Sequence, residues 1–338
     1  MAFKKDPYQI IPFRSYSAAN HLYAKGRALE DENIDLNKKG FFPMLREAYK
    51  RFGTDLIKNT PLLLTLPNGK TIETKTDSQG YYLISQKVEN LGEMADEDGV
   101  LHYKISFVNE FRNRVIQSDN RFLGEIIIPP LTAKFGIISD IDDTIIHTGL
   151  TSRFKWQVIK NTIFKRATKR IPLEGAPEFY YKLHNGRSGK EGNPIFYVSH
   201  GPWNLYHYLE LFLETNHFPK GPILLRDFVN PLTKRFKKRA PLAEKPEKQK
   251  EILNILKTYP TLNFILIGDS GEHDPEIYIE IAEEHPERIL AIYMRSVNHQ
   301  KKMIRVQGLF TDYETVPVLL VQDSKDAIVH AKNMGFIA

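Results

Sequence analysis

The stretch Lys134-Phe135-Gly136-Ile137-Ile138-Ser139-Asp140-Ile141-Asp142-Asp143-Thr144-Ile145-Ile146 decides the fold of this chain. An apolar run leads into three carboxylates within four positions, and a threonine follows at once. Aspartate is a poor strand former, and like charges at this spacing repel one another. We therefore expect a strand that ends at Ser139 and a loop beyond it that carries the acids. In an open parallel sheet, ligands bind at the carboxyl ends of the strands.

Clustered carboxylates at such a strand end indicate a hard cation. Mg²⁺ takes oxygen ligands and keeps positions free for phosphate oxygens. The alternative for an isolated Asp-x-Asp pair is a solvated acidic turn after a buried strand. The rest of the chain decides between these two interpretations.

The composition sets the outer limits of what the chain can be. At 338 residues the chain is longer than one typical domain, so we expect two. A formal net charge of +6 favours anionic partners. There is no cysteine, which excludes disulfides and thiolate metal sites and fits a reducing compartment. Without an apolar signal core or a membrane-spanning apolar run, we expect a cytoplasmic protein, at most peripheral to a membrane.

Residues 1–131 are predicted to form a β-rich domain, a small β-sandwich. Pro67-Asn68-Gly69 is a hairpin signal, and Pro43–Phe52 has the pattern of a single helix. We find no convincing catalytic cluster in this part and interpret it as a structural or interaction module. Pro129-Pro130 marks the boundary, because two prolines end a strand ladder. The predicted strands are Leu62–Leu66, Tyr81–Ser85, His102–Val108 and Phe122–Ile128.

From Thr132 the pattern changes to alternating strands and helices, which predicts an α/β domain over residues 132–338 with a doubly wound, Rossmann-like parallel sheet. Its strands are apolar throughout, as expected for strands buried on both faces. They are Phe135–Ser139, Ile195–Ser199, Ile223–Arg226, Phe264–Gly268 and Leu290–Arg295. The predicted helices are Glu178–Leu183, Leu205–Thr215, Pro246–Lys257, Pro275–Glu284 and Lys325–Met334, the last capped by Asp323 or Ser324.

Polar residues also follow two other predicted strands. Ser199-His200-Gly201-Pro202-Trp203-Asn204 follows one, and Gly268-Asp269-Ser270-Gly271-Glu272-His273-Asp274 follows another, with Lys248 on the helix before it. Taken singly, each feature has an ordinary structural interpretation: the serine as a helix cap, the lysine as a solvent-exposed residue and the glycine-rich segment as a turn. Taken in order, they resemble the four motifs of the haloacid-dehalogenase-like phosphohydrolase superfamily.

The resemblance narrows to one family within that superfamily. The segments 139–144, 197–204, 224–227 and 266–278 resemble the actin-patch-protein type of phosphatidate phosphatase. The likeness covers residues 132–338 closely and the N-terminal part more weakly. His200-Gly201 departs from the two small polar residues of the family pattern. Lys245, Lys248 and Lys250 compete as the motif lysine, and the spacing of Lys248 matches best.

The resemblance implies a role for each matching residue. Asp140 is the nucleophile that forms an aspartyl-phosphate, and Asp142 is the general acid and base. Ser199 and Lys248 hold phosphoryl oxygens. The Mg²⁺ ligands are Asp140, the Asp142 carbonyl, Asp269 and Asp274, and the substrate-binding residues are Thr144, His200 and Arg226. Two alternatives stay open: Thr144, with Asp143, sets the loop geometry, and Arg226 forms an ion pair with Asp227 or Asp269.

An insertion at about 149–190 resembles the cap elements of this superfamily, which cover the active site. Between Gly149 and Pro172 there are seven basic residues and no acidic one, and a second basic run spans 234–239. Basic segments with interleaved aromatic rings are typical of surfaces for anionic lipid. Nucleic acid is the less favoured partner, and a solvated cap helix is the alternative without a ligand. The basic residues are Arg153, Lys155, Lys160, Lys165, Arg166, Lys169 and Arg170, among Phe154, Trp156, Ile159, Ile163 and Phe164.

The sequence thus favours an Mg²⁺-dependent phosphatase for a phosphomonoester lipid, with hydrolysis of phosphatidate to diacylglycerol implied by the resemblance. A phosphatase for a soluble phosphorylated metabolite or a nucleic-acid end is the second hypothesis. A non-catalytic adaptor that binds anionic lipid is the third, and the intact set of acids argues against it.

Overall fold

The computed structural model describes residues 6–18, 20–30, 55–109, 111, 114–141, 144–145, 174–226, 245–270, 273–296 and 300–338. The predicted helix Pro43–Phe52, Asp142, the basic residues 153–170 and the run 234–239 lie outside these ranges. Among the described residues the chain forms two compact units. Unit 1 takes residues up to Pro129 together with Trp203–Tyr208, and unit 2 takes the rest. That residues 1–131 and 132–338 are separate domains stays a prediction.

Unit 1 is built on one eight-stranded sheet in the order β1-β3-β2-β8-β7-β4-β5, with β6 paired to β3. Its pairs are antiparallel except for β2 with β8. Because hydrogen bonds join all eight strands into one sheet, the predicted two-sheet sandwich is not confirmed. The strands are β1 (Tyr8–Pro12), β2 (Ser15–Ala18), β3 (His21–Glu30), β4 (Pro61–Thr65), β5 (Thr71–Lys75), β6 (Tyr81–Lys87), β7 (Val100–Phe107) and β8 (Phe122–Ile127).

Turn chemistry sets the register of unit 1. The Pro67-Asn68-Gly69 signal is confirmed as the β4–β5 hairpin, where Gly69 has φ +81°. At the next turn the Asp77 carboxylate accepts hydrogen bonds from the amides of Gln79 and Tyr81. Gly80 has φ +78° there, and a Cβ would lie 2.7 Å from the carbonyl oxygen of Ala28. This turn therefore delivers Tyr81 to the start of β6.

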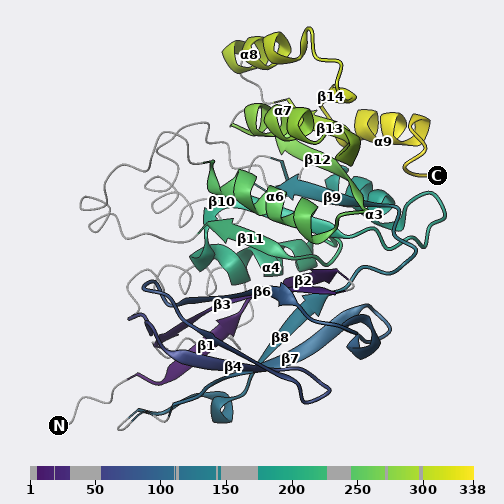
Figure 1. The fold of residues 1–338 in the computed structure, drawn as a ribbon. Helices are drawn as coiled ribbons and strands as arrows, with labels where there is room; N and C mark the ends of the chain where they lie inside the picture. Colours follow the sequence, from purple (N-terminus) through teal and green to yellow (C-terminus); the bar gives the residue numbers. More distant parts are fainter. Residues whose placement is uncertain are drawn as a thin grey trace. The chain divides into compact units, whose positions relative to one another are not determined.

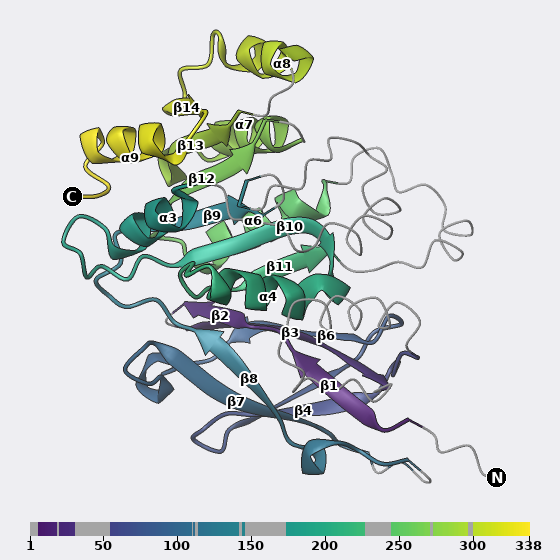
Figure 2. The ribbon, with the colours of Figure 1, turned by 180° about the vertical axis from the view of Figure 1, so that it is seen from behind.

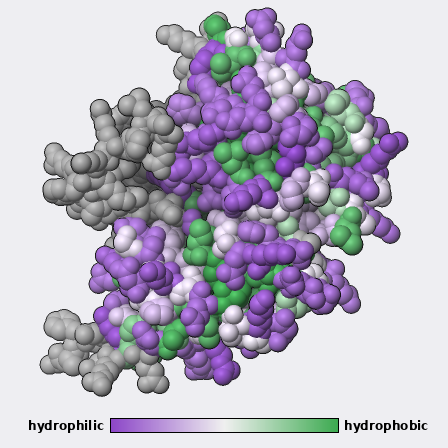
Figure 3. Space-filling model, in the orientation of Figure 1, coloured by the Kyte–Doolittle hydropathy of each residue, from purple (hydrophilic) through white to green (hydrophobic). Residues whose placement is uncertain are grey.

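The inner faces of these strands bury a single apolar core, with side chains such as Leu22, Leu62 and Ile126 fully inside. Outward positions of β6 and β8 leave Leu83 and Leu123 exposed. Figure 3 shows apolar spots of this kind on a face that is otherwise mainly hydrophilic. Among the described residues, no helix has the length and apolar character needed to cross a bilayer.

Unit 2 is built on a six-stranded sheet in the order β11-β10-β9-β12-β13-β14, in which every pair is parallel. The strands are β9 (Phe135–Asp140), β10 (Ile195–Pro202), β11 (Ile223–Arg226), β12 (Asn263–Asp269), β13 (Ile289–Arg295) and β14 (Val318–Val321). The chain runs from β9 to one edge, then returns to place β12 on the other side of β9. The carboxyl end of β9 is therefore the point where the strand order reverses, which is where open α/β sheets bind ligands.

The helices confirm the predicted α/β alternation of unit 2. In the ribbon views, α6 and α7 lie against one face of the sheet (Figure 1), and α3 and α9 lie against the other (Figure 2). The Asp323 carboxylate caps α9 by accepting from the amides of Lys325 and Asp326. The helices are α3 (Ala176–Asn185), α4 (Tyr206–Thr215), α6 (Glu247–Thr258), α7 (Asp274–Glu284), α8 (Gln300–Phe310) and α9 (Ser324–Asn333).

One boundary near the carboxylates differs from the sequence-based expectation. The strand was expected to end at Ser139, but β9 includes Asp140, whose backbone pairs in register with Val198 of β10. The register with β12 ends at Ser139, but β10 still supplies a partner for Asp140, so the ladder continues for one residue despite the low strand propensity of aspartate. The Asp140 side chain is consequently held by a strand rather than by a loop.

Candidate active site

Asp140 stands at the centre of the candidate site because β9 is an inner strand of the sheet of unit 2. Its side chain is almost completely buried. The preceding residue, Ser139, is held by two hydrogen bonds of its side chain. Its hydroxyl donates to the Asp140 carbonyl at 2.7 Å and lies 2.5 Å from the Tyr180 hydroxyl. The backbone that carries Asp140 is therefore bonded to α3 as well as to its neighbouring strands.

Asp269 and Asp274 come from the end of β12 and the start of α7, and both are fully buried. The Asp269 amide donates to the Asp274 carboxylate at 3.4 Å, and Pro275 follows in the first turn of the helix. Gly268 makes this approach possible, since a Cβ there would lie 2.6 Å from the Asp274 carboxylate. Any larger residue at the first glycine of the Gly-Asp-Ser-Gly segment would therefore clash with Asp274.

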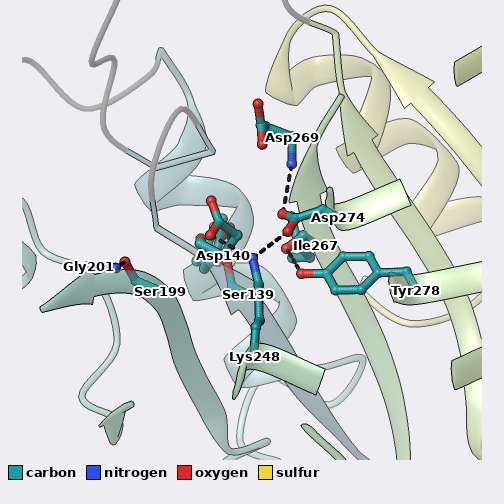
Figure 4. Close-up of polar contacts among 10 residues, drawn as sticks. Ser139, Asp140, Ser199, Gly201, Lys248, Ile267, Asp269, Asp274 and Tyr278 are labelled. Carbon is teal, nitrogen blue, oxygen red and sulfur yellow. Dashed lines mark hydrogen bonds and ion pairs between the residues drawn. The ribbon is translucent and has the colours of Figure 1, made fainter. Parts of the chain in front are cut away.

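Lys248 reaches the carboxylates from α6. Its Nζ lies 2.7 Å from Oδ1 of Asp140 and 2.5 Å from Oδ1 of Asp274, and Figure 4 shows it between them. Burial lowers the pKa of Lys248, but the charges of Asp140 and Asp274 outweigh that effect and hold the pKa well above its usual value. The lysine is therefore an ammonium at neutral pH and offsets one of the negative charges.

The structure distinguishes the three competing lysines. Lys245 pairs with Glu284 at 2.6 Å and with Glu280 at 3.3 Å, and Lys250 pairs with Glu247 at 3.1 Å. Both of these lysines lie at the surface, whereas the Lys248 side chain is fully buried against Asp140. Of the three, Lys248 is the one that meets the carboxylate cluster.

Asp140, Asp269 and Asp274 form a set that fits a divalent cation. Each offers a carboxylate oxygen, and these atoms lie within 4.8 Å of one another. Three buried carboxylates lie here with one ammonium, that of Lys248, among them. An all-oxygen donor set with more carboxylates than cationic groups suits Mg²⁺.

The remaining predicted residues fall into three groups. Ser199 is buried on β10, on the side of β9 opposite β12, and its Oγ accepts from the Gly201 amide at 2.8 Å. Thr144 is buried beyond β9, while His200 is half-buried. Arg226 is exposed at the end of β11. Asp142 and Asp227 lie outside the described ranges.

Two tyrosines belong to the site although the sequence assigned them no role. Burial raises the pKa of Tyr278 well above its usual value, so its hydroxyl keeps its proton and donates to the Ile267 carbonyl at 3.0 Å. The Tyr278 ring also lies 5.8 Å from the Lys248 ammonium. Tyr180 holds Ser139 from α3. Tyr278 is inside the quoted motif, but Tyr180 had no local signal because its partner is 41 residues away.

The fold and the site define a class: an α/β domain with a buried carboxylate cluster and a lysine at the carboxyl end of a parallel sheet. Residues 135–296 match the family model described as the catalytic domain of phosphatidate phosphatase APP1. Over this region the chain is similar to the APP1-type family of phosphatidate phosphatases.

Two yeast proteins are similar in sequence. Phosphatidate phosphatase APP1 of Saccharomyces cerevisiae is 31% identical over 255 residues, covering 75% of this chain and 40% of that protein. The uncharacterized protein C29B5.04c of Schizosaccharomyces pombe is 27% identical over 225 residues, covering 66% of this chain and 34% of its own length. The chain therefore spans well under half the length of either relative.

Among solved structures, the crystal structure of Bacteroides thetaiotamicron EndoBT-3987 with Man5GlcNAc product aligns at 7% identity. The alignment covers 85% of this chain and 77% of that chain, with a TM-score of 0.23. A TM-score that low carries no argument about the fold.

Proposed function

We propose that this chain is an Mg²⁺-dependent phosphatase that hydrolyses the phosphomonoester of phosphatidate to release diacylglycerol, on a doubly wound fold of the haloacid-dehalogenase type. The observation that carries the proposal is the buried cluster of Asp140, Asp269 and Asp274 with Lys248 among them. The match of residues 135–296 to the catalytic domain of phosphatidate phosphatase APP1 supports the chemistry. The strand order, which reverses at β9, supports the fold assignment.

In this proposal Asp140 attacks the phosphorus atom and forms an aspartyl-phosphate as the alcohol leaves. Asp142 protonates the leaving oxygen and then takes a proton from the water that cleaves the acyl phosphate. Ser199 and Lys248 donate hydrogen bonds to phosphoryl oxygens, and Lys248 also keeps the carboxylates together. Asp140, Asp269, Asp274 and the Asp142 carbonyl would hold Mg²⁺, which supplies a positive charge next to the phosphoryl oxygens when it is bound.

Thr144, His200 and Arg226 are proposed to contact the substrate. Thr144 follows the acidic loop, His200 follows Ser199, and Arg226 ends the strand next to β10. The exposed position of Arg226 suits a contact with a bulky substrate at the mouth of the site. An anionic lipid headgroup would satisfy this arrangement, and so would a soluble phosphate ester.

The first prediction concerns substrate and metal. The purified protein is expected to release phosphate from phosphatidate vesicles in the presence of Mg²⁺, and excess chelator should abolish that release, because the cluster has more carboxylates than Lys248 can balance. A panel of soluble phosphate esters and phosphorylated nucleic-acid ends is assayed beside it. Preference for a soluble ester would favour the second hypothesis. No hydrolysis of any phosphomonoester, with anionic vesicles still bound, would favour the adaptor.

The second prediction concerns the basic segment 149–172, which we propose contacts anionic lipid. Each basic residue near an anionic bilayer adds about 1 kcal/mol of attraction. The wild type is expected to co-sediment with vesicles that contain anionic lipid, and less so at high salt, because exposed charges are screened over about 8 Å at physiological ionic strength. The comparison protein carries Lys155→Glu, Lys160→Glu, Lys165→Glu and Lys169→Glu and should not sediment. Equal binding of both proteins would exclude this segment as the lipid contact.

A further inference from the structure

Arg27 of β3 is a buried cation in unit 1 that the proposed chemistry does not use. Only 2% of its surface is exposed. The guanidinium lies 4.1 Å from the centroid of the Trp203 ring and 4.4 Å from that of Tyr81. Its Nε donates to the Gln79 carbonyl at 2.9 Å, and its Nη1 donates to the Tyr81 hydroxyl at 3.2 Å. The two rings meet edge to face, with centroids 6.4 Å apart, and the guanidinium lies over both of them. An arginine that contacts two rings and has its fork hydrogen-bonded has little freedom to move, so the rings are held as well.

The Trp203 ring is held from further sides within the same unit. Phe13 lies 6.4 Å from Trp203 and stacks on Tyr206 at 4.8 Å. The Tyr206 hydroxyl accepts a hydrogen bond from the Arg14 amide at 2.6 Å. The short segment Trp203–Tyr208 is therefore part of unit 1 by its contacts, although 73 residues of the chain separate it from Pro129, where the other described part of that unit ends.

This segment follows β10 directly in the chain. The ladder between β10 and β11 is regular up to Ser199, then shifts register before Pro202 pairs with Arg226. Such bulges re-aim side chains and leave part of a strand without ladder bonds. On one side of the bulge, Val198 is held by its pairing with Asp140. On the other side of the bulge, Pro202 pairs with Arg226 and is followed directly by Trp203.

We propose that Arg27 is a positioning residue for the phosphoryl site: by clamping the Trp203 ring, it holds the far end of the bulge and thereby fixes Ser199. This inference rests on the proposed role of Ser199. Arg27 acts through the covalent chain and touches neither substrate nor metal. The N-terminal sheet would on this view contribute to catalysis, in place of the purely structural or interaction role expected from its sequence.

Arg27→Gln tests the clamp, because glutamine keeps hydrogen-bonding capacity and loses the stacked cation. Arg27→Lys keeps the cation and loses the planar fork, so it should be intermediate. The matched control is Arg114→Gln in the same unit, since Arg114 also lies over a tyrosine ring, Tyr8 at 4.9 Å, and pairs with Glu30 at 2.7 Å. Thermal unfolding of all three variants checks that each one folds.

Amide hydrogen exchange of peptides that cover residues 195–205 gives a readout independent of catalysis. The Gly201 amide, which donates to Ser199, is expected to exchange at least about tenfold faster in Arg27→Gln and at the wild-type rate in Arg114→Gln. Unchanged exchange in Arg27→Gln overturns the proposal, whatever the activity. If Arg27→Gln does not fold, Arg27→Lys decides by the same criterion.

Kinetics with a soluble aryl phosphate then links the clamp to Ser199. Arg27→Gln should lower kcat about 10- to 100-fold, since a misplacement of about 1 Å can cost that much. Introduced into Ser199→Ala, the same change should cost less than about twofold, because the residue it positions is already gone. Full additivity of the two losses overturns the proposal. A wild type that hydrolyses no phosphomonoester would overturn the proposed function instead, and the exchange result would still decide whether Arg27 holds the strand end.

Discussion

Asp140→Asn is expected to abolish the hydrolysis of a soluble aryl phosphate while the fold survives. Asparagine has the shape of aspartate, so the buried end of β9 keeps its packing and its pairing with Val198. The amide, however, cannot serve as the nucleophile of an aspartyl-phosphate mechanism. We expect a loss of at least about 1,000-fold in kcat, measured with protein whose circular dichroism matches the wild type.

The control for this prediction is Asp323→Asn. It makes the same chemical change at the exposed N-cap of α9, where asparagine caps about as well as aspartate. Both activity and unfolding temperature should stay near the wild-type values. Should Asp140→Asn retain more than about a hundredth of the wild-type rate, a barrier change below about 2.7 kcal/mol, Asp140 is not the nucleophile.

Lys248→Met is expected to impair both stability and activity. Methionine fills much of the same space on α6 but leaves the carboxylates of Asp140 and Asp274 buried without the ammonium that lies 2.7 Å and 2.5 Å from them. Removing one partner from a buried charge cluster costs about 3–5 kcal/mol of unfolding free energy. Because Lys248 is the proposed positive donor to the phosphoryl group, its loss should also lower kcat by about 100-fold or more. Urea unfolding in chelator and steady-state kinetics measure the two effects.

Lys245→Met is the matched control, three residues earlier in the chain. Lys245 pairs with Glu284 and Glu280 at the surface, where an ion pair is worth less than about 1 kcal/mol. Its substitution should leave kcat unchanged. If both lysine variants lose the same stability and the same activity, the role assigned to Lys248 is wrong.

Most strands of unit 2 could be predicted from the sequence because they are short apolar runs buried on both faces. Their observed ends differ from the predicted ones by a few residues at most, as for β12, observed at Asn263–Asp269. The sequence missed β14, whose four residues carry little signal, and α8, which begins with polar residues. It also missed β1, β2 and β3. In β3 the polar Lys25 and Arg27 obscure the pattern, and stacking on aromatic rings is what buries Arg27.

The order of polar residues at strand ends was enough to bring Asp140, Lys248, Asp269 and Asp274 forward as site residues, because parallel strands place their carboxyl ends at one edge. Among Lys245, Lys248 and Lys250, the sequence favoured Lys248 only through the spacing of the family pattern. That choice depends on which side of α6 faces β9, and Lys248 is 108 residues from Asp140.

The sequence by itself determined the local character of each element: apolar runs became strands, Asn-Gly and Asp-x-x-Gly segments became turns, and Asp323 became a cap, since propensity and short-range hydrogen bonds act within a few residues. Tertiary structure alone decided that Asp140 stays in the strand, that Lys248 lies between two carboxylates, and that Trp203 packs with Arg27. Each of these outcomes depends on contacts between residues far apart in the chain. Only the folded backbone brings those groups within the few ångströms over which charges, rings and hydrogen bonds act.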